Sequence, residues 1–369
     1  MKFTCERNIL LKEISIAQDI IASKNYISIA SYIYLFAEND VLSIRAKDMK
    51  INFETKVPVS VIESGPAMVL GEKFLGILNQ IPEGEMEFEY KDNKVKIKTT
   101  AKKINYQLKS LDSDKFPELP VSAGEYFEMP IKSFKEMINQ TIFAVSTDES
   151  RMVYNGVFME YLDKKLVMVA TDGRRLALIE KDVGEINNFP GVSVHTKILS
   201  IIKKRAGDEG LIAISVTDRM IFFRFGSYNL SSVLNEVPFI NYRKVIPEKQ
   251  EKTFSVLRLE MLDAIRRVTL LVEQKSNKLF IGLRSGKMLV YSEEGEIGDA
   301  SEEIPCKYDG EDVDIAFKYT YIEEPFKVID SNEICIRFNH SSAAELSKAI
   351  TIMPVPESDY YHIVMPMYT

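Results

Sequence analysis

The sequence predicts an α+β chain built from three copies of one domain, each copy made of two strand-helix-strands repeats. A helical pattern occurs three times along the chain, a second strand-then-helix pattern lies inside each copy, and Pro-containing linkers separate the copies. The chain has 369 residues, so three equal copies would each have 123. Its 46% hydrophobic and 27% charged residues are typical of a globular protein.

The first helical pattern begins at Phe3, Phe127 and Phe254, which are 124 and 127 residues apart. Each Phe is followed by mostly apolar residues at offsets of 7, 11, 14 and 18. This spacing is one face of an α-helix, so we expect a short strand at each Phe and helices over 8–24, 131–145 and 258–272. The residues at these offsets are Leu10, Ile14, Ala17 and Ile21; Phe134, Ile138, Thr141 and Val145; and Met261, Ile265, Val268 and Val272.

The second pattern predicts helices over 72–80, 196–206 and 318–329, each directly after a short apolar strand. A lysine lies just inside each of these helices, at Lys73, Lys197 and Lys318. Alternating runs that meet at 38–40, 163–165 and 284–287 predict β-hairpins between the helices. The last of these turns resembles a phosphate-binding loop, but Ile281 and Met288 replace the Gly and Ser/Thr of that motif.

Two predicted linkers lie where the division into three copies requires them. Phe116–Pro120 and Val245–Lys249 combine proline with polar residues shortly before the next leading Phe. We therefore expect domains over 1–121, 122–247 and 248–369.

Charge is unevenly distributed along the chain. The six helical windows contain 14 Lys/Arg against 8 Asp/Glu, a net of +6, which leaves −13 for the rest of a chain whose total is −7. On a single helix such residues would indicate only a solvated face, but their recurrence on six related helices favours a surface that binds phosphates. The basic residues expected on that surface are Lys73, Lys197, Lys203, Lys204, Arg205, Arg266 and Arg267.

Packing geometry indicates what six equivalent helices could surround. Helices spaced about 9 Å apart, each about 5 Å in radius, leave a hole of only about 7 Å when six of them form a ring. The helices of two chains leave a bore of about 25 Å, which admits a DNA duplex roughly 20 Å across. The repeat number therefore favours a homodimer if the protein is a ring around DNA.

Several classes of protein are disfavoured. No apolar run approaches the roughly 20 residues that cross a bilayer, and charges occupy the N-terminus where a signal peptide would be apolar. Cys5, Cys306 and Cys335 are an odd number without a CxxC pair, so we expect reduced thiols in a cytoplasmic protein. His195, His340 and His362 lack any metal-binding spacing, and we expect neither a metal nor a cofactor.

Four strings carry a resemblance to a known family. They are Ala170-Thr171-Asp172-Gly173-Arg174-Arg175-Leu176-Ala177, the opening Met1-Lys2-Phe3-Thr4, the linker Tyr242-Arg243-Lys244-Val245-Ile246-Pro247 and the ending Val364-Met365-Pro366-Met367. With the three-copy plan, the whole chain resembles the bacterial DNA polymerase III beta subunit, the sliding clamp. The resemblance implies DNA-clamp domains in a head-to-tail, ring-shaped homodimer, with helices lining the bore and sheets outside.

The same resemblance implies a non-catalytic processivity factor that encircles double-stranded DNA without sequence specificity. Its partners would be the replicative polymerase alpha subunit, clamp-loader subunits, other polymerases and repair proteins. It would act in the cytoplasm, associated with the nucleoid.

The family's hydrophobic partner-peptide pocket can be carried over position by position. It would comprise Tyr154, Thr171, Gly173, Arg174, Arg175, Leu176, Ile240, Lys244, Val245, Ser342, Ile363, Val364, Met365, Pro366, Met367 and Tyr368. Several positions depart from the family pattern: Arg174 replaces a common histidine, Ile240 a proline and Tyr154 a leucine. The resemblance also implies a DNA contact at Lys24 and a dimer interface in which Leu270 and Leu271 meet Tyr106 and Leu108 of the second chain.

An enzymatic alternative uses Asp172. A duplicated α+β enzyme acting on phosphates or carbohydrates could use its carboxylate as a nucleophile. An Asp-Gly after an apolar strand is more typical of a turn, however, and no second carboxylate lies beside it in the sequence. We therefore expect the chain not to be an enzyme.

Overall fold

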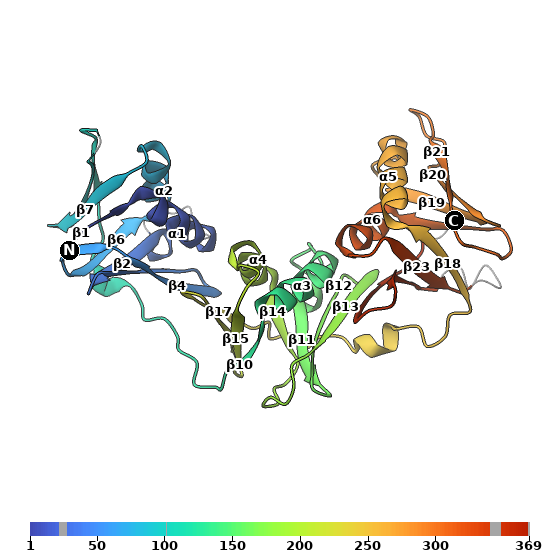
Figure 1. Ribbon diagram of the computed structural model, residues 1–369, viewed down its shortest axis with the longest axis horizontal. Coiled ribbons are helices and arrows are strands. Elements are labelled where there is room, and N and C mark those ends of the chain that lie inside the picture. The colour runs from blue at the N-terminus through green and yellow to red at the C-terminus, as the bar shows by residue number, and fades with distance from the viewer. Residues whose placement is uncertain (22–27, 101, 340–347, 368–369) are drawn as a thin grey trace. The chain divides into compact units, whose positions relative to one another are not determined.

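A computed structural model describes the chain except residues 22–27, 101, 340–347 and 368–369 (Figure 1). The described residues form two compact units, one of residues 1–134 and 200–234 and the other of 135–199 and 235–369.

The order of elements repeats three times. The first copy runs β1 (Lys2–Glu6), α1 (Arg7–Ile20), β2 (Tyr32–Glu38), β3 (Val41–Lys47), β4 (Ile51–Pro58), β5 (Ser60–Glu63), β6 (Gly65–Leu70), α2 (Gly71–Gln80), β7 (Glu85–Lys91), β8 (Lys94–Thr99) and β9 (Asn105–Lys109). The second runs β10 (Phe127–Pro130), α3 (Ile131–Thr141), β11 (Gly156–Leu162), β12 (Lys165–Thr171), β13 (Arg175–Asp182), β14 (Val192–His195), α4 (Thr196–Arg205), β15 (Leu211–Val216), β16 (Met220–Phe225) and β17 (Tyr228–Val233).

The third copy runs β18 (Lys252–Leu257), α5 (Arg258–Val268), β19 (Lys278–Arg284), β20 (Lys287–Tyr291), β21 (Ser301–Pro305), β22 (Val313–Lys318), α6 (Tyr319–Val328), β23 (Glu333–Phe338), β24 (Ile350–Val355) and β25 (Tyr360–Val364). Apart from the additional β5 in the first copy, each has the order strand, helix, four strands, helix, three strands. The predicted three-copy α+β plan, with two strand-helix-strands repeats in each copy, is therefore confirmed.

The first unit contains two antiparallel sheets. One has the strand order β5-β1-β7-β8-β9, and the other has the order β10-β15-β16-β17-β4-β3-β2-β6. In the larger sheet, β4 of the first copy pairs with β17 of the second, with Phe53 opposite Leu230. Helices α1 and α2 pack against each other in this unit (Figure 1).

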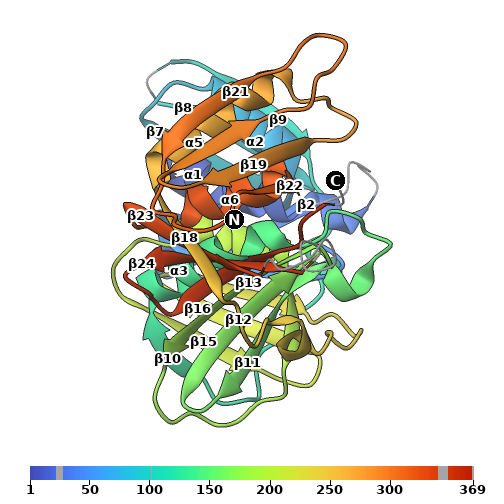
Figure 2. The same cartoon turned by 90° about the vertical axis from the view of Figure 1, so that its right-hand side faces the viewer.

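The second unit repeats this arrangement. Its larger sheet has the order β14-β11-β12-β13-β25-β24-β23-β18, and its smaller sheet has the order β21-β20-β19-β22 (Figure 2). Strand β13 of the second copy pairs with β25 of the third, with Leu176 opposite Ile363. This pairing, called the seam below, brings together residues that are far apart in the sequence.

The predicted helix faces form the core. Leu10, Ile14 and Ala17 of α1 are fully buried, and the leading Phe3 stacks on Phe88 with ring centroids 5.0 Å apart. Helices α3 and α5 end at Thr141 and Val268, earlier than predicted, and each is followed by a short 3-10 turn. The predicted position of Lys318 is also wrong: Lys318 ends β22 and precedes the first turn of α6 rather than lying inside the helix. Its extended backbone, with φ −68° and ψ 118°, places it at the N-cap.

The predicted hairpins are confirmed by their turns. Asn39 and Asp40 between β2 and β3 have φ of 51° and 59°, and Asp163 and Lys164 between β11 and β12 have φ of 51° and 66°. Such pairs of positive φ match the twist of the strands that they join. Gly286 has φ 77° in the turn between β19 and β20, so the string that resembles a phosphate loop is a hairpin turn.

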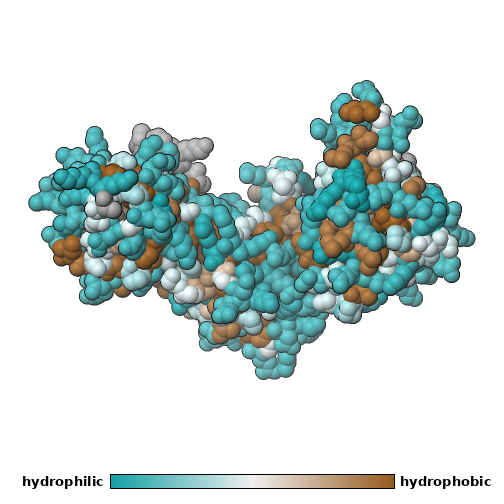
Figure 3. Space-filling view, turned by 45° about the horizontal axis from the view of Figure 1, so that its top comes forward, coloured by the Kyte–Doolittle hydropathy of each residue, from teal (hydrophilic) through white to brown (hydrophobic). Residues whose placement is uncertain are grey.

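Hydrophilic side chains cover most of the surface drawn in Figure 3, with hydrophobic residues in smaller patches. Among the described residues, no helix has both the length and the apolar character needed to cross a membrane. The three cysteines are free, and burial raises the pKa of the Cys5 thiol to about 12. That thiol is therefore protonated and unreactive at neutral pH.

Candidate functional site

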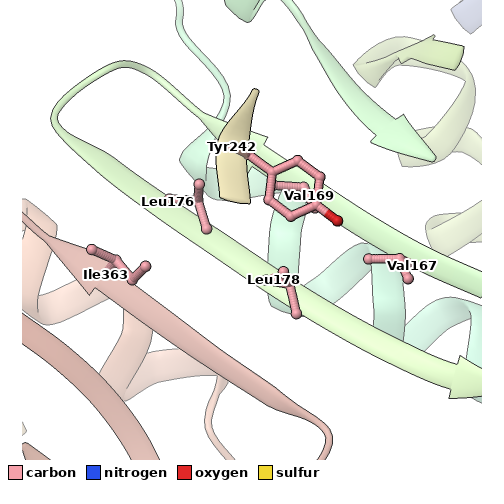
Figure 4. Packing of buried hydrophobic residues seen from close by; sticks show 6 residues of the cluster. All are labelled: Val167, Val169, Leu176, Leu178, Tyr242 and Ile363. Carbon is pink, nitrogen blue, oxygen red and sulfur yellow. The ribbon is translucent and has the colours of Figure 1, made fainter. Parts of the chain in front are cut away.

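A buried apolar cluster lies where the seam meets the segment between the second and third copies (Figure 4). Its six buried residues are Val167, Val169, Leu176, Leu178, Tyr242 and Ile363. Partly buried hydrophobic residues packed against them include Phe158, Phe239, Ile240, Ile246, Ala349 and Tyr361. The cluster is called the seam cluster below.

Strand periodicity explains how the cluster forms. Alternate residues of a strand share a face, so Val167 and Val169 of β12 project to the same side as Leu176 and Leu178 of β13. Val169 lies opposite Leu178, and Leu176 lies opposite Ile363 across the seam. Three strands thus supply one continuous apolar face.

The segment over this face is held by a polar anchor. Tyr242, in a 3-10 turn (Tyr242–Val245), is 4% exposed, and its hydroxyl donates a hydrogen bond of 2.5 Å to Glu160. Arg243 forms an ion pair with the same carboxylate. Burial, with a further contribution from the Glu160 carboxylate, raises the pKa of Tyr242, so its hydroxyl remains a donor. Phe158 stacks on Phe239 at 4.8 Å beside this anchor.

A groove of about 380 Å³ opens next to the seam cluster. It is lined by Leu162, Val167, Leu178, Glu180, Tyr242, Arg243, Ile246, Ser358, Asp359 and Tyr361. Apolar side chains thus share the lining with charged ones. Such a groove suits a short segment that has both apolar and polar side chains.

The turn between β12 and β13 is built by Asp172 and Gly173. The Asp172 carboxylate accepts hydrogen bonds from the backbone N–H groups of Arg174 and Arg175 at 2.9 and 3.2 Å. Gly173 has φ 87°, and a Cβ there would lie 2.9 Å from the Arg151 guanidinium and 3.6 Å from Tyr154. Glycine is required here both by the backbone conformation and by the close approach of these side chains.

The carried-over pocket residues do not all share one face. Leu176 and Ile363 belong to the seam cluster, and Ile240 packs against it. Arg175 and Val364 pair one position along the seam and therefore project to the opposite face of the sheet. There Arg175 is engaged by α6, where it forms an ion pair with Glu324 and stacks over the ring of Tyr321 at 4.7 Å.

The C-terminal residues are fixed by backbone hydrogen bonds. Met365 N–H donates to the Arg174 carbonyl at 2.8 Å, and Met367 N–H donates to the Ala316 carbonyl at 2.8 Å. Thr171 is buried at the end of β12. Pro366 lies between the two anchored methionines and is half-buried.

Other carried-over positions lie apart from the seam cluster or outside the described residues. Lys244 and Val245 are exposed, whereas their neighbours Tyr242, Arg243 and Ile246 line the groove. Ser342 and Tyr368 lie outside the described residues, as does Lys24.

Sequence reasoning missed Val167, Val169, Leu178 and Tyr242. Both strands are continuous apolar runs, at 166–170 and 176–179, so alternation does not separate one face from the other. Counting two residues along from Leu176 would have identified Leu178, whereas the placement of Val167 and Val169 depends on the pairing of β12 with β13. Nothing in the sequence distinguishes the inward Tyr242 from the outward Lys244.

Several basic residues expected to bind phosphates have acidic neighbours. Asp19 contacts Arg205 at 3.2 Å and Lys204 at 3.5 Å. Arg267 makes two hydrogen bonds to Glu302, at 2.7 and 2.6 Å. The i,i+3 neighbour Asp263 contacts Arg266 at 3.3 Å, and Glu72 contacts Lys73 at 3.5 Å. Lys197 lies in the first turn of α4, and Lys203 is exposed in its last turn.

The residues expected at a dimer interface lie on an edge strand of the first unit and in a 3-10 turn of the second. Tyr106 and Leu108 are half-buried on β9, the last strand of the smaller sheet in the first unit. Leu270 is 82% exposed in the short turn after α5, and Leu271 beside it is half-buried. Helix α5 packs against β21, the edge strand of the smaller sheet in the second unit.

The enzymatic alternative gains no support. The Asp172 carboxylate is occupied by the turn and by Arg175 Nε at 3.1 Å. Within the parts of the chain that the structure describes, no group of three or more His, Cys, Asp or Glu side chains could hold a metal ion.

Comparison with known proteins gives consistent results along the whole chain. Residues 1–120, 128–239 and 243–368 match the models for the N-terminal, central and C-terminal domains of the DNA polymerase III beta subunit. The beta sliding clamp of Treponema pallidum is 42% identical over 376 residues, with 100% of both chains covered.

Solved structures agree with this match. The sliding clamp of Bacillus subtilis superposes with a TM-score of 0.91 at 25% identity, covering 100% of this chain and 99% of that one. A clamp of Pseudomonas aeruginosa bound to griselimycin has a TM-score of 0.92 at 22% identity, with 100% of both chains covered. The chain therefore belongs to the DNA polymerase III beta subunit family, the beta sliding clamps.

Proposed function

We propose that two copies of this chain form a head-to-tail ring around double-stranded DNA and hold the replicative polymerase on it. The observation that carries the proposal is the match of three successive clamp-domain models to a chain whose described residues form six equivalent helices. A ring holds DNA by topology and makes no base-specific contact, and the protein is a processivity factor rather than an enzyme. It acts in the cytoplasm, in association with the nucleoid.

The test of this proposal uses closed and open DNA. The purified protein, loaded onto nicked circular DNA by its clamp loader, should remain bound through gel filtration. Cutting the circle once should release it, because a ring slides off a free end. Equal retention on circular and linear DNA would contradict topological binding.

The seam cluster and its groove are the proposed site for partner peptides. The polymerase alpha subunit, clamp-loader subunits, other polymerases and repair proteins would bind there in turn. A groove that is lined by apolar side chains together with the charged Glu180, Arg243 and Asp359 suits short peptides of mixed character. Deleting residues 365–369 should abolish binding of a labelled polymerase alpha peptide and leave the protein dimeric; unaltered affinity would refute the assignment.

Charge supports the head-to-tail dimer. Residues 94–109, which include β8 and β9, contain six lysines and no acidic residue. Residues 293–303, which lead into edge strand β21, contain six acidic residues and no Lys or Arg. The basic edge of one chain therefore complements the acidic edge of a second, and unpaired edge strands readily extend a sheet between chains.

A further inference from the structure

Arg175 links helix α6 to the turn at the start of β13. Its Nε contacts Asp172 at 3.1 Å, its Nη1 forms an ion pair with Glu324, and its Nη2 donates to the Phe143 carbonyl at 2.5 Å. The guanidinium also lies over the ring of Tyr321. The Arg175 side chain is only 10% exposed, so this planar group is occupied by the protein itself.

The effect of Arg175 extends to the C-terminal segment. Asp172, which Arg175 orients, accepts the backbone N–H groups that shape the turn. The Arg174 carbonyl in that turn accepts the N–H of Met365. A chain of contacts therefore runs from Glu324 on α6, through Arg175 and Asp172, to Met365, which directly follows β25.

A second connection joins α6 to the other strand of the seam. Gln140 Nε2 donates at 2.7 Å to the carbonyl of Val328, the last residue of α6. Gln140 Oε1 must then accept the 3.1 Å hydrogen bond from His362 Nε2, which fixes the imidazole tautomer. His362 directly precedes Ile363 of the seam cluster, so α6 is connected to both β13 and β25.

We propose that Glu324 is a positioning residue for the partner-peptide site, acting through Arg175. The inference rests on the function proposed for the seam cluster. Removal of the Glu324 charge leaves one edge of the mostly buried Arg175 guanidinium without an anionic partner. An unpaired charge raises the free energy of a low-dielectric site. Arg175 would then shift toward another acceptor, and Asp172 would lose the contact that orients the turn.

The test measures affinity of the full-length dimer for a fluorescein-labelled peptide from the cognate polymerase alpha subunit. Glu324→Gln should weaken binding about fivefold, the size of effect expected from a coupled network. Glu323→Gln is the matched control, because Glu323 pairs at 2.8 Å with Lys327 inside the same helix. That variant should bind like the unmodified chain, and the dimer mass should be unchanged in both.

A double-mutant cycle separates positioning from direct contact. In an Asp172→Asn background, Glu324→Gln should cause little further loss, because both changes interrupt the same chain of contacts. Additive losses, or equal affinity of Glu324→Gln and the unmodified chain, would overturn the inference. If Glu324→Gln does not fold, Glu324→Asp, which retains the charge on a shorter stem, is used in the same cycle. Failure of the unmodified chain to bind the peptide would instead refute the proposed site.

Discussion

The Tyr228 hydroxyl donates a hydrogen bond of 3.0 Å to the buried carboxylate of Glu13. It joins β17 of the second copy to α1 of the first, within one compact unit. Glu13 is 4% exposed, and its second oxygen has no partner among the described residues. Burial raises the pKa of Glu13 even though Tyr228, Lys12 and Arg205 act in the opposite direction.

Tyr228→Phe should therefore destabilise the chain by about 1–3 kcal/mol, because it leaves a buried acceptor without a donor. A carboxyl whose pKa is raised in the folded state stabilises the fold most at low pH. That contribution to the free energy of unfolding is lost as pH rises through the folded pKa. The stability deficit should accordingly be larger at pH 8 than at pH 5. Thermal unfolding at the two pH values measures it.

Tyr90→Phe is the control for that prediction. The Tyr90 hydroxyl donates at 3.0 Å to Asn93 at an exposed site, so its loss should change the unfolding midpoint little at either pH. A similar deficit in both variants would show that the buried Glu13 is not responsible.

The buried imidazole of His362 predicts a second pH dependence. Burial, with a smaller contribution from nearby Arg175, lowers the pKa of His362 to about 3 from an ordinary value of 6.5. Between these values the unfolded chain binds a proton that the folded chain does not, so stability is lost as pH falls below 6.5. His362→Gln removes this loss, which amounts to about 2 kcal/mol between pH 6.5 and pH 5.

The unfolding midpoint should therefore fall less steeply with acid in His362→Gln than in the unmodified chain. Parallel pH curves for the unmodified chain and His362→Gln would contradict the assignment.

Local periodicity made most of the fold predictable. The spacing after Phe3, Phe127 and Phe254 identified three helices because a buried face must recur with the helical period. Turn residues such as Asn39-Asp40 identified hairpins for an equally local reason.

The site was less predictable because it depends on pairing between distant strands. The register that places Leu176 opposite Ile363, and Arg175 on the other face, is fixed by β13 meeting β25. The family resemblance implied that Arg175 belongs to the partner-peptide pocket, whereas the structure surrounds its guanidinium with Asp172, Glu324 and Phe143. A charged residue's partners cannot be read from its own neighbourhood when they come from other elements.

Two of the three basic residues in the last turn of α4, Lys203 and Arg205, predict different outcomes for DNA retention. Lys203 is exposed, so Lys203→Ala should reduce the salt dependence of DNA binding by about 0.9 in log–log slope if it contacts one phosphate. The thermal stability of Lys203→Ala should equal that of the unmodified chain. Gel-shift titrations over a range of salt concentrations measure the slope.

Arg205 should behave differently because its side chain is 17% exposed and contacts Ser15 and Asp19 of α1. Arg205→Ala should lower the unfolding midpoint as well as DNA binding. A salt slope unaltered in Lys203→Ala would remove that lysine from the proposed DNA surface.

The charged edges predict how dimerisation responds to salt. Reversing two charges in Lys102→Glu/Lys103→Glu should weaken the dimer at least about tenfold, since several exposed pairs of about 0.2–1 kcal/mol change sign at both interfaces. Added salt should weaken the unmodified dimer and strengthen the variant, because it screens attraction in one and repulsion in the other. Adding Glu294→Lys/Glu296→Lys to the same chain should restore association, whereas Lys56→Glu, at an exposed position on β4, should leave it unchanged. Sedimentation equilibrium measures the dimer dissociation constant of each variant. A dissociation constant that none of these charge reversals changes would show that the two edges do not meet.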